Sequence, residues 1–214
     1  LEYNGYVLYS NTFTITMAVS EHPDYYEDDG YKCSQCYCDL AAAIFKDGKT
    51  MGYVDFADAL AAAQTDENKG CTLKVLADVN EKIAVKTGSF TLDATNRTIK
   101  GALNVAKSAD LTVSGGVITG NVICAKGGKL TASNTYFAGA INCVGEGEFR
   151  NCNLAGTVAG KGGLKLYSCE IPGNLSISGN AEAEECIVSG TVTVNNGGSF
   201  KSTGDTYRNT INVK

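Results

Sequence analysis

Three cysteines near the start of the chain could bind a metal ion. The segment Cys33-Ser-Gln-Cys36-Tyr-Cys38 brings three thiols together, and His22, the single histidine of the chain, precedes them. Thiolate sulfur and imidazole nitrogen are ligands that zinc prefers, and four of them complete a tetrahedral site. We therefore predict a zinc site formed by His22, Cys33, Cys36 and Cys38. A single Cys-x-x-Cys pair also fits a local disulfide or thiols without metal.

The other cysteines follow a different pattern. Cys152, Cys169 and Cys186 recur every 17 residues, and Cys124 and Cys143 are 19 residues apart. This spacing places them at equivalent positions of successive repeats, where we expect them to point into a core as small apolar side chains. Cys71 immediately precedes a predicted strand, and we assign it no function.

A repeat of 17 to 19 residues runs through the second half of the chain. Rungs begin at residues 103, 122, 141, 158, 175 and 192, and a further rung begins at 211. The first and third positions of a rung are mostly apolar and the second is mostly small or polar, which is typical of strands that stack and bury one another. The repeat predicts a right-handed parallel β-helix.

The alignment of the rungs predicts where their corners lie. Each rung has a second inward residue eight positions after its first, in the series Leu111, Leu130, Phe149, Leu166, Ala183 and Phe200. The length difference between rungs then falls between this residue and the next rung. Glycines recur at the closing corner as Gly120, Gly139, Gly156, Gly173 and Gly190. We expect a positive φ there, which glycine adopts at little cost.

An N-terminal cap precedes the repeat. Residues 71–79 form a first strand, and Ile83, Val85, Leu92 and Ile99 fit an earlier turn of the same ladder. The alanine-rich segment 55–64 predicts a short helix with Phe56, Leu60 and Ala63 on one face, covering the open end of the solenoid. The fold class is therefore all-β, with a β-helix domain over residues 51–214 and a small β-rich unit over residues 1–50. At the other end, the rung that begins at Ile211 has no cap, so either further rungs or an end-to-end contact could cover it.

Composition limits the classes of partner. The net charge is −5, and ten acidic residues stand against three basic ones in residues 1–60. These features argue against nucleic acid or an anionic membrane as partner, and no apolar run reaches the length of a membrane span. Tyrosines, which suit partner surfaces, concentrate in the N-terminal unit. The candidate contact residues are Tyr3, Tyr6, Tyr9, Tyr25, Tyr26, Tyr31 and Tyr37. The same tyrosines could equally form the core of this unit.

Catalytic patterns are weak. A single histidine disfavours a Ser-His-Asp or Cys-His arrangement. The outward second positions of the rungs contain no carboxylate and read Asn104, Ile123, Asn142, Ala159, Ser176, Thr193 and Asn212. The acidic groups Glu146/Glu148 and Glu182/Glu184/Glu185 are expected at solvated corners. We predict a protein that is not an enzyme.

The segment from residue 20 to residue 105 resembles a known kind of protein. Cys33-x-x-Cys36 before Tyr53-Val-Asp-Phe-Ala-Asp-Ala-Leu, then Thr72-Leu-Lys-Val-Leu-Ala-Asp-Val, is similar to modules of large repetitive surface proteins from Gram-positive gut bacteria. The resemblance implies an extracellular or cell-surface module for adhesion to a host protein or glycan. The alternatives are a glycan-active enzyme, its carbohydrate-binding domain, or a structural spacer.

Overall fold

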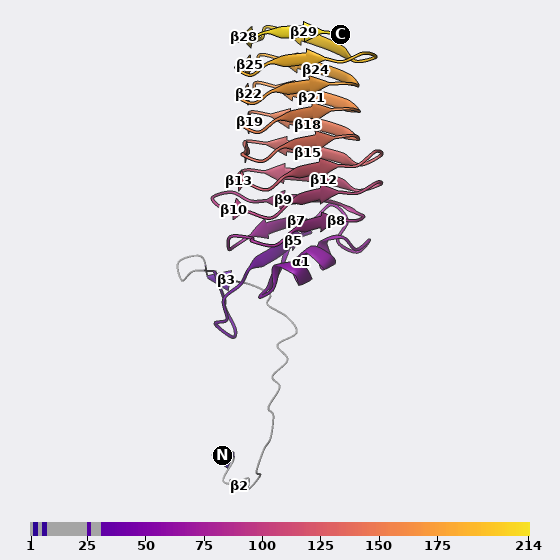
Figure 1. Ribbon diagram of the computed structural model, residues 1–214. Coiled ribbons are helices and arrows are strands. Elements are labelled where there is room, and N and C mark those ends of the chain that lie inside the picture. Colours follow the sequence, from indigo (N-terminus) through magenta and orange to yellow (C-terminus); the bar gives the residue numbers. More distant parts are fainter. Residues whose placement is uncertain (1, 4–5, 8–24, 27–30) are drawn as a thin grey trace.

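The computed structural model describes residues 2–3, 6–7, 25–26 and 31–214, and its main body is a parallel β-solenoid (Figure 1). Three sheets of seven, eight and ten strands run along the stack. Consecutive rungs pair in parallel, residue by residue, along each sheet. The predicted β-helix is confirmed.

Each of the seven complete rungs, from β8–β10 to β26–β28, contributes one strand to each sheet. The ten-stranded sheet contains β6 (Lys49–Tyr53), β5 (Ala42–Lys46), β7 (Thr72–Val75), β9 (Ser89–Asp93), β12 (Asp110–Ser114), β15 (Lys129–Ser133), β18 (Glu146–Arg150), β21 (Gly163–Tyr167), β24 (Asn180–Glu184) and β27 (Ser199–Thr203). The eight-stranded sheet contains β8 (Ile83–Val85), β11 (Leu103–Val105), β14 (Val122–Cys124), β17 (Ile141–Cys143), β20 (Val158–Gly160), β23 (Leu175–Ile177), β26 (Val192–Val194) and β29 (Ile211–Val213). The seven-stranded sheet contains β10 (Thr98–Ile99), β13 (Val117–Ile118), β16 (Tyr136–Phe137), β19 (Asn153–Leu154), β22 (Glu170–Ile171), β25 (Ile187–Val188) and β28 (Thr206–Tyr207).

Helix α1 (Phe56–Ala63) lies at the N-terminal end of the stack, as the alanine-rich pattern predicts (Figure 1). The Asp55 side chain accepts a hydrogen bond from the backbone N–H of Ala57 and so caps the helix. Phe56, Leu60 and Ala63 are buried against the solenoid core. The antiparallel hairpin β5–β6 extends the ten-stranded sheet by pairing with β7, so it crosses the boundary at residue 50 that composition suggests.

Two short antiparallel pairs are described before the cap. Strands β1 (Glu2–Tyr3) and β2 (Tyr6–Val7) pair with each other, and β3 (Tyr25–Tyr26) pairs with β4 (Lys32–Cys33). The second pair leads directly into the cysteine segment, so the local backbone around Cys33 belongs to a hairpin.

The register of the ten-stranded sheet differs from the sequence prediction. Leu130 pairs with Gly147, and Phe149 pairs with Ala132, so the predicted alignment of Phe149 with Leu130 is wrong by two residues. The extra residues of a long rung lie in the corner before this sheet, at 125–128 against 144–145 in a short rung. A shift of two preserves the strand's inward face, so hydrophobic pattern alone could not detect it.

The recurrent corner glycines have a different role from the one predicted. None of Gly120, Gly139, Gly156, Gly173 and Gly190 has a positive φ. A Cβ placed on Gly156 would lie 2.2 Å from the carbonyl oxygen of Gly139 in the preceding rung. Glycine is therefore required because successive backbones stack too closely for any side chain.

Positive φ values occur at another corner, between the ten-stranded and seven-stranded sheets. Each rung places one or more residues there in the left-handed region, and these are Asn96, Gly115, Gly116, Asn134, Asn151, Ser168, Glu185 and Gly204. Asparagine and glycine tolerate this conformation, whereas glutamate does so at a cost. Glu185 is therefore a locally strained choice.

The last rung exposes apolar side chains. Ile211 and Val213 of β29 are 45% and 77% exposed, while their counterparts one rung earlier are buried. The end-to-end contact stays a prediction. Within the part of the chain that the structure describes, no helix has the length and apolar character needed to cross a membrane.

Candidate metal centre and outer surface

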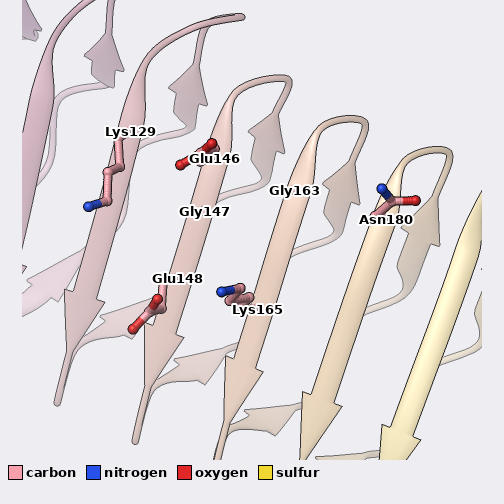
Figure 2. A pocket seen from close by; sticks show the side chains of 7 residues that line it. All are labelled: Lys129, Glu146, Gly147, Glu148, Gly163, Lys165 and Asn180. Carbon is pink, nitrogen blue, oxygen red and sulfur yellow. The ribbon is translucent and has the colours of Figure 1, made fainter.

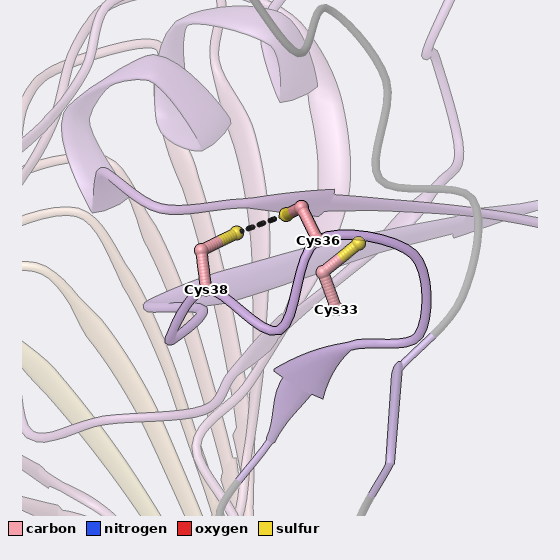
Figure 3. A group of neighbouring side chains, drawn as sticks. All are labelled: Cys33, Cys36 and Cys38. Atoms are coloured by element: carbon pink, nitrogen blue, oxygen red, sulfur yellow. Dashed lines mark hydrogen bonds between the residues drawn. The ribbon is translucent and has the colours of Figure 1, made fainter. Parts of the chain in front are cut away.

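The three N-terminal cysteines converge in a tight turn, here called the cysteine knuckle (Cys33, Cys36 and Cys38). Their sulfur atoms all lie within 4.8 Å of one another, and the Cys36 and Cys38 sulfurs are 2.7 Å apart (Figure 3). The backbone closes the turn, since the N–H of Cys33 donates to the carbonyl of Cys38 and the N–H of Tyr37 donates to that of Cys33. The cluster could hold a metal ion.

Hydrogen bonding makes two of the knuckle thiols unequal. The hydrogen bond from Cys38 lowers the pKa of Cys36. Burial and the hydrogen bond to Cys36 raise the pKa of Cys38 to about 11. The backbone N–H of Gln35 also donates to the Cys33 sulfur at 3.4 Å. Donors directed at sulfur stabilise a thiolate, which is the form that binds a metal.

The knuckle is fixed to the solenoid by packing. Cys33 is buried in a small apolar cluster with Leu40, Ala43 and Leu76. The Tyr31 ring, which packs on this cluster, has the Arg97 guanidinium 5.0 Å from its centroid. Arg97 lies just before β10, so a cation–π contact joins the knuckle to the first full rung.

The other predicted contact and ligand residues are placed as follows. His22 and Tyr9 lie outside the described residues, and Tyr3, Tyr6, Tyr25 and Tyr26 lie in described strands whose side chains are not placed. Tyr31 is half-buried against the knuckle, whereas Tyr37 is 61% exposed on the same turn. Two tyrosines are thus next to the cysteines.

The five repeat cysteines are buried, as predicted, and none of them forms a disulfide. Three of them also donate hydrogen bonds to the carbonyl of the last residue of the preceding strand, as Cys169 does to Tyr167 at 3.3 Å. Thr135, in the same column, makes the equivalent bond to Ser133. Hydrogen bonding with Cys152 raises the pKa of Cys169 to about 11, which keeps this thiol protonated. These side chains therefore fill the core and also form hydrogen bonds across the corners between the ten-stranded and seven-stranded sheets.

Acidic residues lie on the outer face of the ten-stranded sheet. Glu146 and Glu148 belong to β18, and Glu182 and Glu184 to β24, so the prediction that they sit at corners is wrong. Only Glu185 is at a corner. The inward residues between them, such as Gly147 and Ala183, are small. Strands in which charged residues alternate with glycine or alanine resemble turns in composition, and this explains the wrong prediction.

Charges alternate along one column of this face. Strand pairing places Glu148, Lys165, Glu182 and Lys201 next to one another in successive rungs. Glu148 also pairs with Arg150 at 2.8 Å, and the Arg150 guanidinium covers the Tyr167 ring at 4.0 Å. The outward row of the eight-stranded sheet matches the predicted one and carries no acid.

The same outer face is hollowed over Gly163. A depression of about 390 Å³ lies there, and Figure 2 shows Glu146, Asn180, Glu148 and Lys165 around it. A second depression of about 320 Å³ shares Lys129, Glu146 and Gly163 with the first and extends over the adjacent corner. Sequence reasoning missed this feature, because it depends on the corrected register.

The fold and the knuckle define the class of protein as a parallel β-solenoid whose N-terminal cap carries a three-thiol cluster able to hold a metal ion. Comparison with protein-family models, with curated proteins and with solved structures finds no match to this chain.

Proposed function

We propose that this chain is a non-catalytic, extracellular module that binds a host protein or glycan. The observation that carries the proposal is the outer face of the ten-stranded sheet, where polar and charged side chains of successive rungs stand in register beside a depression. Strand spacing repeats them at about 4.8 Å along the axis. A regular array of this kind suits an extended ligand. The resemblance of residues 20–105 to bacterial surface proteins supports the location.

A glycan-cleaving enzyme is the alternative. Such an enzyme needs one carboxyl group that holds a proton beside another that is ionised. Here Lys165 lies between Glu148 and Glu182, and Arg150 is bonded to Glu148. Both glutamates of this column therefore stand beside a cation of the adjacent strand. This arrangement supports binding over hydrolysis.

The cysteine knuckle supports zinc as the metal. Three sulfur donors in one turn favour a soft or borderline cation over calcium or magnesium, which take oxygen ligands. Cys33, Cys36 and Cys38 would hold the ion, with His22 as the fourth ligand. Because the knuckle packs on the cap, the metal would fasten the N-terminal segment to the solenoid.

A binding screen tests the main proposal. The purified protein is applied to immobilised host glycans and to secreted host proteins, including immunoglobulins, and then incubated with oligosaccharides to detect cleavage. Saturable binding without cleavage is expected. Shortened oligosaccharides would support the enzyme instead, and a lack of binding to every probe would leave a spacer. Tyr37→Ala should weaken binding only if the partner contacts the knuckle.

A further inference from the structure

The corners beside the ten-stranded sheet differ in length, and this difference shapes the surface. Three consecutive rungs turn through short corners at residues 144–145, 161–162 and 178–179. The flanking rungs turn through longer corners at 125–128 and 195–198, which project further at the right-hand edge of Figure 1. We call the recess over the three short corners the corner notch. At a strand spacing of about 4.8 Å, the three rungs span on the order of 14 Å.

The corner notch has a flat backbone floor. A Cβ on Gly145, Gly162 or Gly179 would lie between 2.1 and 2.3 Å from a carbonyl oxygen of the preceding rung, so these three positions have no side chain. Gly163 continues the floor onto the sheet, where the two depressions meet. In repeat proteins, changes in corner length often mark the binding face.

The side chains around the notch balance in charge. Two lysines, Lys129 and Lys165, and two glutamates, Glu146 and Glu148, line the larger depression together with Asn180. A strongly anionic or cationic ligand would meet as many like charges as opposite ones. The lining offers ammonium donors, carboxylate acceptors and an amide that does both. Hydroxyl groups donate and accept in the same way, so a neutral, hydroxyl-rich ligand satisfies all of them.

Part of this lining is held in position before any ligand binds. Glu148 is held by Arg150, whose guanidinium rests on the Tyr167 ring. Asn180 accepts a hydrogen bond from Ser199 at 2.9 Å through its Oδ1 atom. Side chains that are already ordered lose less entropy on binding.

We propose that the corner notch binds a neutral oligosaccharide, lying across the short rungs with its hydroxyl groups on Lys129, Glu146, Lys165 and Asn180. This inference rests on the proposed binding function and names its ligand class and site.

Two variants test the site. Gly163→Tyr fills the notch, and it should fold because a Cβ there meets only the Glu146 Cγ at 3.9 Å. Thr193→Tyr places the same side chain on the outer face of the eight-stranded sheet as a control. The probes are arrays of neutral tri- and tetrasaccharides, their sialylated and sulfated counterparts, and host proteins. Thermal unfolding confirms that both variants are folded.

The expected result is neutral-glycan binding by the wild type, lost by about tenfold or more in Gly163→Tyr and kept in Thr193→Tyr. Equal binding by Gly163→Tyr and the wild type would overturn the notch while leaving the binding function intact. A preference for acidic glycans, or for proteins alone, would overturn the ligand class. If the wild type binds none of the probes, both this inference and the proposed function fail.

Discussion

Replacing one stacking glycine by alanine should destabilise the solenoid far more than replacing a nearby strand glycine. In Gly156→Ala the new Cβ would lie 2.2 Å from the Gly139 carbonyl oxygen and 2.5 Å from its carbon. Real Cβ atoms do not approach backbone this closely, so two rungs must separate locally. In the matched change, Gly163→Ala, the new Cβ would meet only the Glu146 Cγ, at 3.9 Å.

The size of the difference follows from these contacts. Overpacking costs typically about 1–3 kcal/mol, and we take the upper end of this range because the clashing atoms belong to the backbone and cannot rotate away. A glycine-to-alanine change without strain instead stabilises by about 0.5 kcal/mol, because alanine restricts the unfolded chain. The two variants should therefore differ by roughly 3.5 kcal/mol in unfolding free energy. For a chain of this size that corresponds to about 10 °C in Tm.

Thermal and guanidinium unfolding followed by far-UV circular dichroism measure this difference. Gly173→Ala, whose Cβ would lie 2.1 Å from the Gly156 carbonyl oxygen, should reproduce the loss in the next rung. The reasoning would be refuted if both stacking variants melted within about 2 °C of Gly163→Ala. That result would mean that the corner glycines tolerate a side chain and that close stacking does not select them.

Three further predictions concern single side chains. Wild-type protein refolded with zinc should hold about one equivalent, Cys36→Ser well below half, and Cys169→Ser the same as wild type, by elemental analysis; equal metal in all three would rule out the knuckle. Cys169→Ala should lower stability by about 1 kcal/mol in denaturant unfolding because the Tyr167 carbonyl loses one of its two donors and keeps only the Asn151 N–H, whereas Cys169→Ser should keep most of the stability. Glu185→Gly should raise Tm by about 2 °C because it removes a left-handed φ from a residue with a Cβ, and Glu184→Gly, in the neighbouring strand, should lower it. The opposite order of those two variants would contradict the strain assigned to this corner.

The solenoid could be predicted from sequence because stacking repeats the same demand in every rung. Leu103, Val122 and Ile141 all fill one inward column, and a chain of such positions identifies the period even when single residues vary. The register across the ten-stranded sheet could not be predicted, because Gly147 stands at an inward position where Leu130 and Leu164 stand in other rungs. In this strand the large inward side chain is Phe149, two residues after Gly147, whereas in β15 it is Leu130, two residues before Ala132.

The candidate sites differ in the same way. The knuckle could be predicted from the sequence because its three cysteines are close in the chain, so a local turn brings them together. The sequence indicates the hydrogen-bonding role of the buried cysteines only weakly. Polar residues, Thr135 and Asp205, occupy the two ends of the column that contains Cys152, Cys169 and Cys186. Both can close the corner, as Thr135 Oγ1 does by donating to Ser133 and Asp205 Oδ2 by accepting from Thr203.

The corner notch could be found only from the structure. It arises because three rungs have corners two residues shorter than those of the rungs on either side. Strand pairing fixes the length of every strand in a solenoid, since one extra residue would turn a whole inward face outward. Corners are free of this constraint, and here they alone change length. A recess made by shortening corners leaves the inward columns intact, so Leu164 and Leu166 remain buried beneath the charged residues above them. The fold can therefore form a recess on its surface without weakening its core.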